Sequence, residues 1–351
     1  MPPGVYPTPP WKSILQASLQ SGLEVSPTAG VCSEAYTQLA TVGSDGVPRN
    51  RTVVFRGFAG NKPVHRVLPS FLKSQAVTNA QEKAIQQNKV ATVGRFQSEL
   101  LVFTTHLLSD KIHELEKNPQ VEVCWFLPTT NEQFRLRGHM YMITSPTYYG
   151  HHVAATQSYQ ETSRYLQQFC WADPAPESDD SSIDWELLRL NHFFYMSPEL
   201  RSSFICDYSG KPYTSLTSQE QRDCQSQLAL TQLNLEQPDS SPSSSNHSTH
   251  RQVQQALQNF VLLILKPDYV DRCQLNTTPA TRTVYVRQDR VPSAWHPSSE
   301  RTPGLKESDL KPSSSQYLGG QPTGPAEISD HQKSDASSNH HQQWKSFSLV
   351  P

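Results

Sequence analysis

The stretch YTQLATVGSDGVPRNRTVVFRGF, residues 36–58, decides the fold. Its two short, mainly apolar runs, 38–42 and 52–55, are rich in β-branched residues, which suit the pleated, half-buried surface of a strand. Between them lies GSDGVP (43–48), where glycine permits positive φ, aspartate bonds nearby backbone and proline fixes φ. The stretch therefore predicts a β-hairpin.

The second strand of this hairpin carries an arginine at each end, Arg51 and Arg56, and only Thr52 is polar between them. Guanidinium groups are seldom buried unpaired, and their geometry matches that of carboxylates and phosphates. A bound anion is therefore one interpretation of the pair. Two surface arginines that flank a core strand are the other, and these residues alone leave both open.

Composition separates a folded part from two biased segments. Apolar residues make up 35% of the 351 residues, below the roughly 45–50% of a typical globular chain. Serine, proline, glutamine, asparagine and histidine dominate 232–250 and 296–345, which bury too little surface to offset chain entropy. We expect one domain with a disordered insertion and a disordered tail. Its parts are 1–231, with an insertion at 61–98, then the disordered 232–252, the closing strands in 253–295, and the tail 296–351.

Charge and motif content exclude several classes of function. The formal net charge of −2 argues against nucleic-acid binding. The N-terminus lacks a signal-peptide pattern, and the longest apolar run, 260–265, is too short to cross a bilayer. The six cysteines have no CxxC spacing, which favours free thiols in a reducing compartment. The histidines show no ligand spacing. We therefore expect a cytoplasmic protein without a metal or membrane partner.

Further strands and a few helices follow along the chain. Strands are predicted at 99–105, 121–127, 133–142, 260–265 and 282–287, and helices at 11–22, 76–87, 109–118, 158–170 and 184–194. About seven strands with few helices are typical of an antiparallel barrel or sandwich. The fold class predicted is mainly β with flanking helices (α+β).

An anion cradle is predicted where a strand ends and a helix begins. Ser109 is a candidate N-cap, and the unpaired N–H groups and dipole of a helix start favour an anion. Thr104 and Thr105 bring two hydroxyl groups, and Lys111 brings a charge to the first turn. With Arg51 these residues make a site for one phosphate, although Lys111 alone would more often be a solvated helix lysine. No GxGxxG or GxxxxGK[ST] motif is present.

Four segments together resemble a known family. They are RTVVFR (51–56), LVFTTHLLSDK (101–111), ELEKNPQVEVCWF (114–126) and EQFRLRG (132–138). In this order and spacing they resemble the pyridoxamine 5'-phosphate oxidase-like, FMN-binding split-barrel family, and most closely an uncharacterised branch of it. The resemblance covers about 11–290, interrupted at 61–98 and 217–252. It implies an antiparallel split β-barrel that binds FMN.

The resemblance also implies roles for individual residues. Arg51 and Lys111 would hold the FMN phosphate, with help from Thr104, Thr105 and Ser109. The backbone of Thr52, Val53 and Val54 would run beside the isoalloxazine ring.

Other implied roles concern the dimer and the substrate. Family members form homodimers that bind FMN between the subunits, so Gln133 would reach the flavin of the other subunit. Arg56 and Arg201, the latter in SPELRSSF (197–204), would lie on the substrate side.

Three departures from the oxidase predict an altered substrate site. Asp110 stands where the oxidase has an arginine beside the lysine. Arg272 stands at the position of a tryptophan, and TPATR (278–282) replaces an Arg-Leu-His-Asp-Arg run that grips flavin and pyridoxal phosphate. Only Arg282 remains of that run.

Two functional hypotheses follow. The first is a flavin-dependent oxidoreductase, because a flavin carries the redox chemistry itself and needs no protein nucleophile. The second is a non-catalytic flavin carrier or sensor, or an interaction module that works through the Ser/Pro/Gln-rich segments, since a fold does not fix a function.

Overall fold

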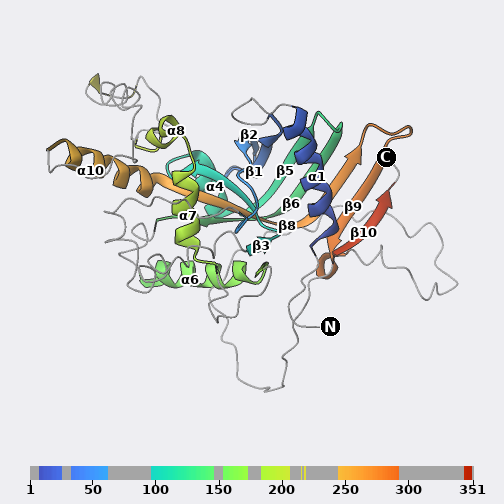
Figure 1. The fold of residues 1–351 in the computed structure, drawn as a ribbon. Helices are drawn as coiled ribbons and strands as arrows, with labels where there is room; N and C mark the ends of the chain where they lie inside the picture. Colours follow the sequence, from blue (N-terminus) through green and yellow to red (C-terminus); the bar gives the residue numbers. More distant parts are fainter. Residues whose placement is uncertain are drawn as a thin grey trace, which may run out of the picture.

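An antiparallel sheet forms the centre of the computed structural model (Figure 1). The structure describes residues 8–25, 33–61, 96–145, 153–172, 183–205, 215, 217–218, 244–291 and 344–349. The main sheet has eight strands in the order β10-β9-β8-β6-β5-β1-β2, with β4 also paired to β8. The prediction of a mainly β protein with flanking helices is confirmed.

The elements have the following bounds. The strands of the main sheet are β1 (Tyr36–Val42), β2 (Pro48–Val54), β4 (Leu101–His106), β5 (Gln120–Leu127), β6 (Glu132–Ile143), β8 (Phe260–Gln274), β9 (Thr281–Arg287) and β10 (Trp344–Leu349). A second sheet pairs β3 (Phe96–Ser98) with β7 (Cys170–Ala172). The helices are α1 (Pro10–Val25), α4 (Asp110–Lys117), α6 (Val153–Gln167), α7 (Trp185–Phe194), α8 (Pro198–Ser202) and α10 (Ser244–Asn259), with short 3-10 turns η1 (Ser33–Ala35) and η4 (Gln288–Arg290).

The predicted hairpin is β1 and β2, paired from Tyr36↔Val54 to Val42↔Pro48. Its turn is closed by a hydrogen bond from the Gly43 N–H to the Val47 carbonyl at 2.9 Å. Gly46 has a φ of 78°, which glycine adopts without a steric penalty. The second strand begins at Pro48, earlier than the apolar pattern alone predicts, because cross-strand pairing also orders the polar residues before Arg51.

The sheet curls but its ladders do not close. β2 and β4 share no ladder, and the segment after β2 bridges the gap instead. The Arg56 N–H donates to the Val102 carbonyl at 2.8 Å, and the Val102 N–H donates to the Gly57 carbonyl at 2.9 Å. Phe58 and Leu101 form an isolated bridge. The end of the hairpin is thereby fixed beside β4, which leads to α4.

The long strand β8 is shared between neighbours. Its first part, Phe260–Leu265, pairs with β4, its last part, Tyr269–Gln274, pairs with β9, and β6 pairs along most of its length. The register shifts at Gly138 of β6, where a Cβ atom would lie 2.0 Å from the Lys266 carbonyl oxygen. Glycine is therefore required by the close approach of the two backbones.

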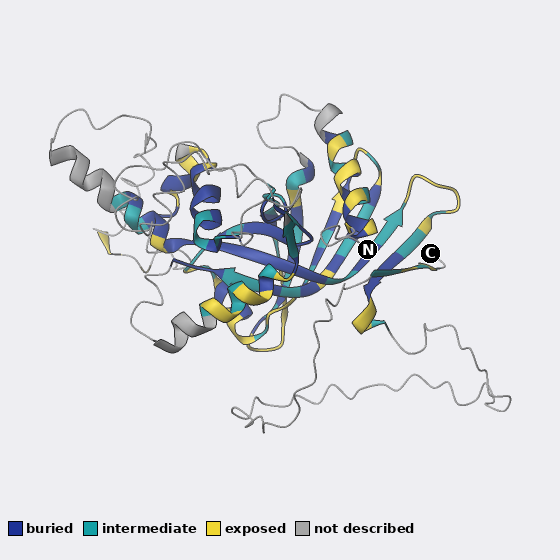
Figure 2. Cartoon of the chain, turned by 60° about the horizontal axis from the view of Figure 1, so that its bottom comes forward, coloured by how far each residue is buried: buried dark blue, intermediate teal, exposed yellow. Residues whose placement is uncertain are grey.

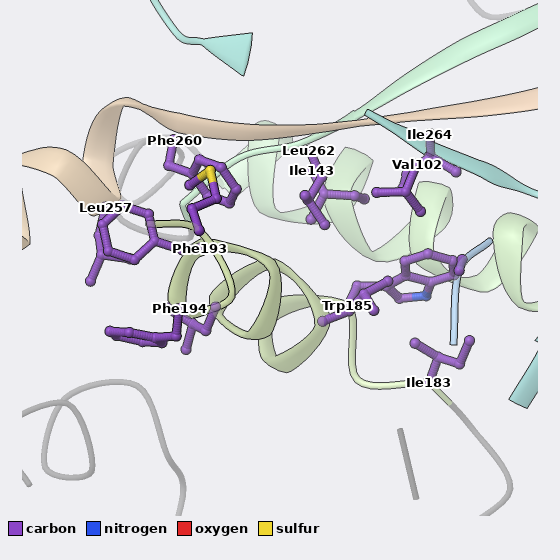
Figure 3. Packing of buried hydrophobic residues seen from close by; sticks show 14 of the residues in the cluster. Val102, Ile143, Ile183, Trp185, Phe193, Phe194, Leu257, Phe260, Leu262 and Ile264 are labelled. Carbon is purple, nitrogen blue, oxygen red and sulfur yellow. The ribbon is translucent and has the colours of Figure 1, made fainter. Parts of the chain in front are cut away.

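Two hydrophobic cores lie on opposite faces of this sheet. The first is covered by α1 and α4 and includes Trp11, Leu15, Leu39, Phe103, Trp125 and Leu263. The second is covered by α6, α7 and α10, and Figure 3 shows Trp185 and Phe193 of α7 facing Leu262 and Ile264 of β8. Successive residues of a strand point to opposite faces, so burial on both sides explains the uninterrupted apolar run of 260–265. Buried residues follow the central strands, while exposed ones gather in the β8–β9 turn (Figure 2).

Three segments differ from the composition-based expectation. Residues 344–349, within the predicted disordered tail, form β10 and pair with β9 from Trp344↔Arg287 to Leu349↔Arg282. Helix α10 covers part of the predicted disordered insertion, and β3 lies at the end of the insertion predicted at 61–98. Composition alone does not indicate such elements when their partners lie elsewhere in the chain: Trp344 of β10, for example, contacts Glu99 and Arg287. The helix predicted at 76–87, and residues 232–243 and 296–343, lie outside the described residues.

Candidate functional site

Arg51 lies at the centre of a polar cluster at one end of the first core. Its Nη1 donates to the Leu39 carbonyl at 3.4 Å and to the Thr41 hydroxyl, both on the neighbouring strand β1. Its Nη2 donates to Oε2 of Glu114, on α4, at 2.6 Å. The guanidinium is therefore held in one orientation by contacts from a strand and a helix.

Lys111 and two hydroxyl groups gather where β4 passes into α4. The Lys111 Nζ donates to the Thr105 hydroxyl at 3.0 Å, and that hydroxyl lies 3.0 Å from the Ser109 hydroxyl. Ser109 occupies the N-cap position, as predicted, but its side chain bonds the His106 carbonyl at 2.8 Å and makes no cap hydrogen bond. No side chain of the N-cap thus competes for the first N–H groups of α4, which suits an anion site.

Arg51 and Lys111 repel each other electrostatically. Burial lowers the pKa of Lys111 below its ordinary value, and the positive charge of Arg51 lowers it further. Glu114 and Asp110 act in the opposite direction on that pKa. Two neighbouring cations repel each other, and an anion bound near both of them relieves this repulsion. Thr105, Ser109 and Lys111 are thus linked by hydrogen bonds, and Arg51 acts on Lys111 through its charge.

Glu114 is the member of this cluster that the sequence reasoning missed. Burial acts to raise the pKa of its carboxyl group, but hydrogen bonds from Thr41 and Arg51 and the charges of Arg51 and Arg49 outweigh it and hold the pKa below its usual value. Glu114 is therefore ionised at neutral pH. Its position three residues after Lys111 puts both on one face of a helix, which is the signal that could have revealed it.

Thr104 does not share the cluster of Thr105. Adjacent residues of a strand face opposite sides, and the Thr104 hydroxyl accepts a long hydrogen bond from the Arg56 Nε at 3.4 Å. Burial lowers the pKa of Arg56, and Arg56 has no carboxylate partner among the described residues. A second cationic position therefore lies on the other side of β4.

The three ring-side residues of β2 alternate in exposure. Thr52 is exposed and Val54 is half-buried, whereas Val53 is buried in the first core. The side chain of Val53 is thus out of reach of a ligand, and this residue could contact one only through its backbone. In the described part of the chain β2 forms a ladder with β1 alone, which leaves its other edge for backbone contacts.

Two predicted residues, Gln133 and Arg282, lie away from Arg51. Gln133 on β6 is opposite Phe126 and Cys273, with β5 and β1 between β6 and β2. Arg282 on β9 donates to both oxygens of the buried Asp271, at 3.0 and 2.7 Å. One chain alone therefore does not bring Gln133 or Arg282 to the phosphate cluster.

Arg201 on α8 is buried, and its guanidinium binds carbonyl groups at the end of α7. Its Nη1 donates to the carbonyls of Phe194 at 3.0 Å and Met196 at 2.7 Å. Nearby, the ring of Phe204 stacks on His106 at the end of β4, with centroids 5.9 Å apart. The segment thus neighbours the Arg56 side of β4, while Arg201 itself has a structural contact.

The described residues contain neither a metal-binding cluster nor a membrane-spanning helix. No group of three or more histidine, cysteine, aspartate or glutamate residues is arranged to hold a metal ion there. None of the helices in that part of the chain is long and apolar enough to cross a membrane.

Comparison with known proteins adds a family match. Residues 8–144 match the model described as the FMN-binding domain of pyridoxamine 5'-phosphate oxidase. The Arabidopsis thaliana protein pyridoxine/pyridoxamine 5'-phosphate oxidase 2 is 25% identical over 270 residues, which are 76% of this chain and 84% of that protein. A solved pyridoxamine 5'-phosphate oxidase-related FMN-binding protein of Nostoc punctiforme is 19% identical, with a TM-score of 0.47, over 98% of this chain and 100% of its own. PhzG of Burkholderia lata is 15% identical, with a TM-score of 0.40, over 81% and 89% of the two chains.

Proposed function

Because residues 8–144 belong to the pyridoxamine 5'-phosphate oxidase family of FMN-binding domains, we propose that this chain binds FMN and works as a flavin-dependent oxidoreductase. The observation that carries the proposal is the hydrogen-bonded group of Lys111, Thr105 and Ser109 at the start of α4. Arg51 is bound to Glu114 of the same helix. The family match indicates the cofactor, and the cluster at the start of α4 is where we propose that its phosphate binds.

The cluster fits the phosphate of FMN. Arg51 and Lys111 provide two positive charges, Thr105 and Ser109 provide hydroxyl groups, and the first N–H groups of α4 provide donors without a side-chain cap. These are the groups that bind phosphate dianions at helix starts.

The flavin ring would lie along the free edge of β2. The backbone of Thr52, Val53 and Val54 would face the polar edge of the ring. When bound, FMN supplies the hydride or electron chemistry, and the residues of the chain bind it, orient it and set its electrostatic surroundings.

We include a homodimer and a cytoplasmic location in the proposal. Tyr36 and Phe126, each 45% exposed, lie on the same outer face of the sheet as Gln133. Exposed aromatic residues of this kind are typical of interfaces. A second subunit packed there would let Gln133 reach the flavin of its partner, which it cannot do within one chain.

The substrate site would differ from that of the oxidase. Arg272 is bound to the buried Glu132, with its Nε 2.8 Å from Oε1, and Arg282 is bound to the buried Asp271. Arg272 thus has a carboxylate partner of its own, whereas Arg282 shares Asp271 with Arg135. Arg56, which has no such partner among the described residues, remains the substrate-side cation of the proposal. Arg201 stays a weaker candidate because of its contacts to α7.

A flavin carrier or sensor is the second candidate. The negative charges of Asp110 and Glu114 beside the cradle favour it, because they weaken phosphate binding and would make a bound flavin easier to exchange.

The first experiment is the visible absorption spectrum of the purified protein, with identification of any released chromophore. Released FMN at about one per subunit supports FMN binding; a colourless protein that also fails to bind added FMN contradicts it. Turnover of the bound flavin with NADPH, amines or alcohols then separates the oxidoreductase from the carrier. As a residue-level test, Arg51→Ala should lose FMN while Arg290→Ala, at an exposed arginine of η4, should keep it.

A further inference from the structure

A carboxylate is built into the cluster that would hold the flavin phosphate. We propose that Glu114 is a counter-anion whose negative charge limits the affinity for the phosphate group of FMN, and thereby sets the preference for FMN over riboflavin. The inference rests on the proposed function, since it concerns the same phosphate site.

The contacts of Glu114 keep its charge inside the cluster. The residue is 6% exposed. Its Oε2 accepts hydrogen bonds from Arg51 Nη2 at 2.6 Å and from the Thr41 hydroxyl at 2.5 Å, and its Oε1 lies 3.4 Å from the Arg49 Nε. A carboxylate held by three partners stays ionised and cannot swing into solvent when a ligand arrives.

The negative charge of Glu114 acts on both cations of the cluster, Arg51 and Lys111. Arg51 contacts Glu114 directly, and Glu114 is among the charges that act on Lys111. A phosphate dianion that approaches Arg51 and Lys111 therefore meets two positive charges and one buried negative charge. Asp110 also bears a negative charge, but it is exposed and is screened by water and salt far more than Glu114.

The guanidinium of Arg51 would have to bind the phosphate while it keeps its contacts within the chain. Its Nη1 and Nη2 already donate to Leu39, Thr41 and Glu114. An incoming phosphate therefore gains only part of the hydrogen bonding that an uncommitted arginine would offer. Riboflavin, which has no phosphate, neither gains from the cations nor suffers from Glu114.

Glu114→Gln separates the charge from the hydrogen bonding, because the amide oxygen can still accept from Arg51. We would titrate the apoprotein with FMN and with riboflavin by flavin fluorescence. The variant should bind FMN about tenfold more tightly, which corresponds to about 1.4 kcal/mol, and riboflavin within about twofold of wild type. Glu116→Gln removes the same charge from the exposed face of α4 and should leave both affinities unchanged.

Unchanged or weaker FMN binding by folded Glu114→Gln protein would overturn the proposal and make Glu114 a support for Arg51 only. An equal gain in Glu116→Gln would overturn it too, since bulk charge would then be the cause. If Glu114→Gln does not fold, Arg49→Gln acts on the same carboxylate from the solvent side. It should weaken FMN binding about threefold and spare riboflavin, and no change in FMN binding would overturn the inference. Wild-type protein that binds no FMN at all would instead refute the proposed function.

Discussion

The indole nitrogen of Trp344 donates a hydrogen bond to Oε2 of Glu99 at 2.9 Å, across 245 residues of sequence. Glu99 is buried, precedes β4 and also accepts from Arg287 of β9. The ring of Trp344 lies 5.8 Å from that of Trp11 on α1. A single side chain of β10 thus joins both ends of the chain to the strand that leads to the phosphate cluster.

We expect Trp344→Ala to lower the free energy of unfolding by about 2–4 kcal/mol, because it removes buried aromatic surface and leaves Glu99 with one donor fewer. Urea unfolding followed by tryptophan fluorescence or circular dichroism measures this. Ser346→Ala, at an exposed position of the same strand, should change the stability by less than about 0.5 kcal/mol. Equal unfolding midpoints for wild type and Trp344→Ala would show that β10 contributes nothing to the folded state.

The sequence predicts local features of this fold well and β10 not at all. The β1–β2 hairpin is encoded in its own turn, and β8 in its own apolar run. β10 follows a long polar segment, and what orders it is contact with Trp11, Glu99 and Arg287. These partners lie far from Trp344 in the sequence, so no local pattern around Trp344 indicates the strand.

Lys12 predicts a pH dependence of stability. The residue is fully buried, its Nζ donates to the Gln97 side chain at 3.2 Å, and it lies 4.7 Å from the centre of the Phe58 ring. Burial lowers the pKa of Lys12 to about 8 from 10.5, against the opposing charges of Glu99 and Cys170. Between these two values the unfolded chain binds more protons than the folded one, so the contribution of Lys12 to stability rises with pH.

The comparison with Lys12→Met isolates this effect. The wild type should gain about 2 kcal/mol in free energy of unfolding relative to the variant between about pH 7.5 and 9.5. Tyrosines that titrate in both proteins cancel in the difference. A difference that stays constant, or falls, over this range would mean that the Lys12 pKa is not depressed by burial.

The candidate site was predictable where neighbours in sequence make it. Thr105, Ser109 and Lys111 converge because a strand end and a helix start follow directly along the chain. Glu114 was missed although it lies three residues after Lys111, whereas the pairing of Glu132 with Arg272 spans 140 residues and has no local signal. Thr104 was placed in the cluster although strand alternation turns its side chain toward Arg56. The resemblance to a family supplied positions, and the partners of those positions needed the structure.

A substitution of Arg201 tests whether this residue has a structural or a substrate-side role. Its guanidinium donates to two carbonyls at the end of α7, so Arg201→Met should cost about 2–3 kcal/mol of stability because buried acceptors lose their donors. Thermal unfolding and FMN titration of the same samples measure the two effects separately, and we expect FMN affinity to stay unchanged. A variant with wild-type stability but an altered KM for a substrate would instead support the substrate-side role that the sequence implied.

Lys111 predicts how FMN affinity depends on pH. Burial and the charge of Arg51 lower the pKa of Lys111 below 10.5, whereas a bound phosphate dianion would raise it. Protons are then taken up on binding at alkaline pH, so the affinity should fall as the pH rises through the lowered pKa. The phosphate itself titrates near pH 6, so it stays a dianion throughout a titration series between about pH 7.5 and 10.

Two variants test this assignment. Lys111→Met should bind FMN more weakly by about tenfold or more and lose the alkaline decline, after correction by the same series with riboflavin. Lys117→Met, at the exposed last turn of α4, should keep the wild-type profile. An alkaline decline that persists in Lys111→Met would mean that another group titrates. Lys111 would then lie outside the phosphate site, and Arg51 would be the cation that holds it.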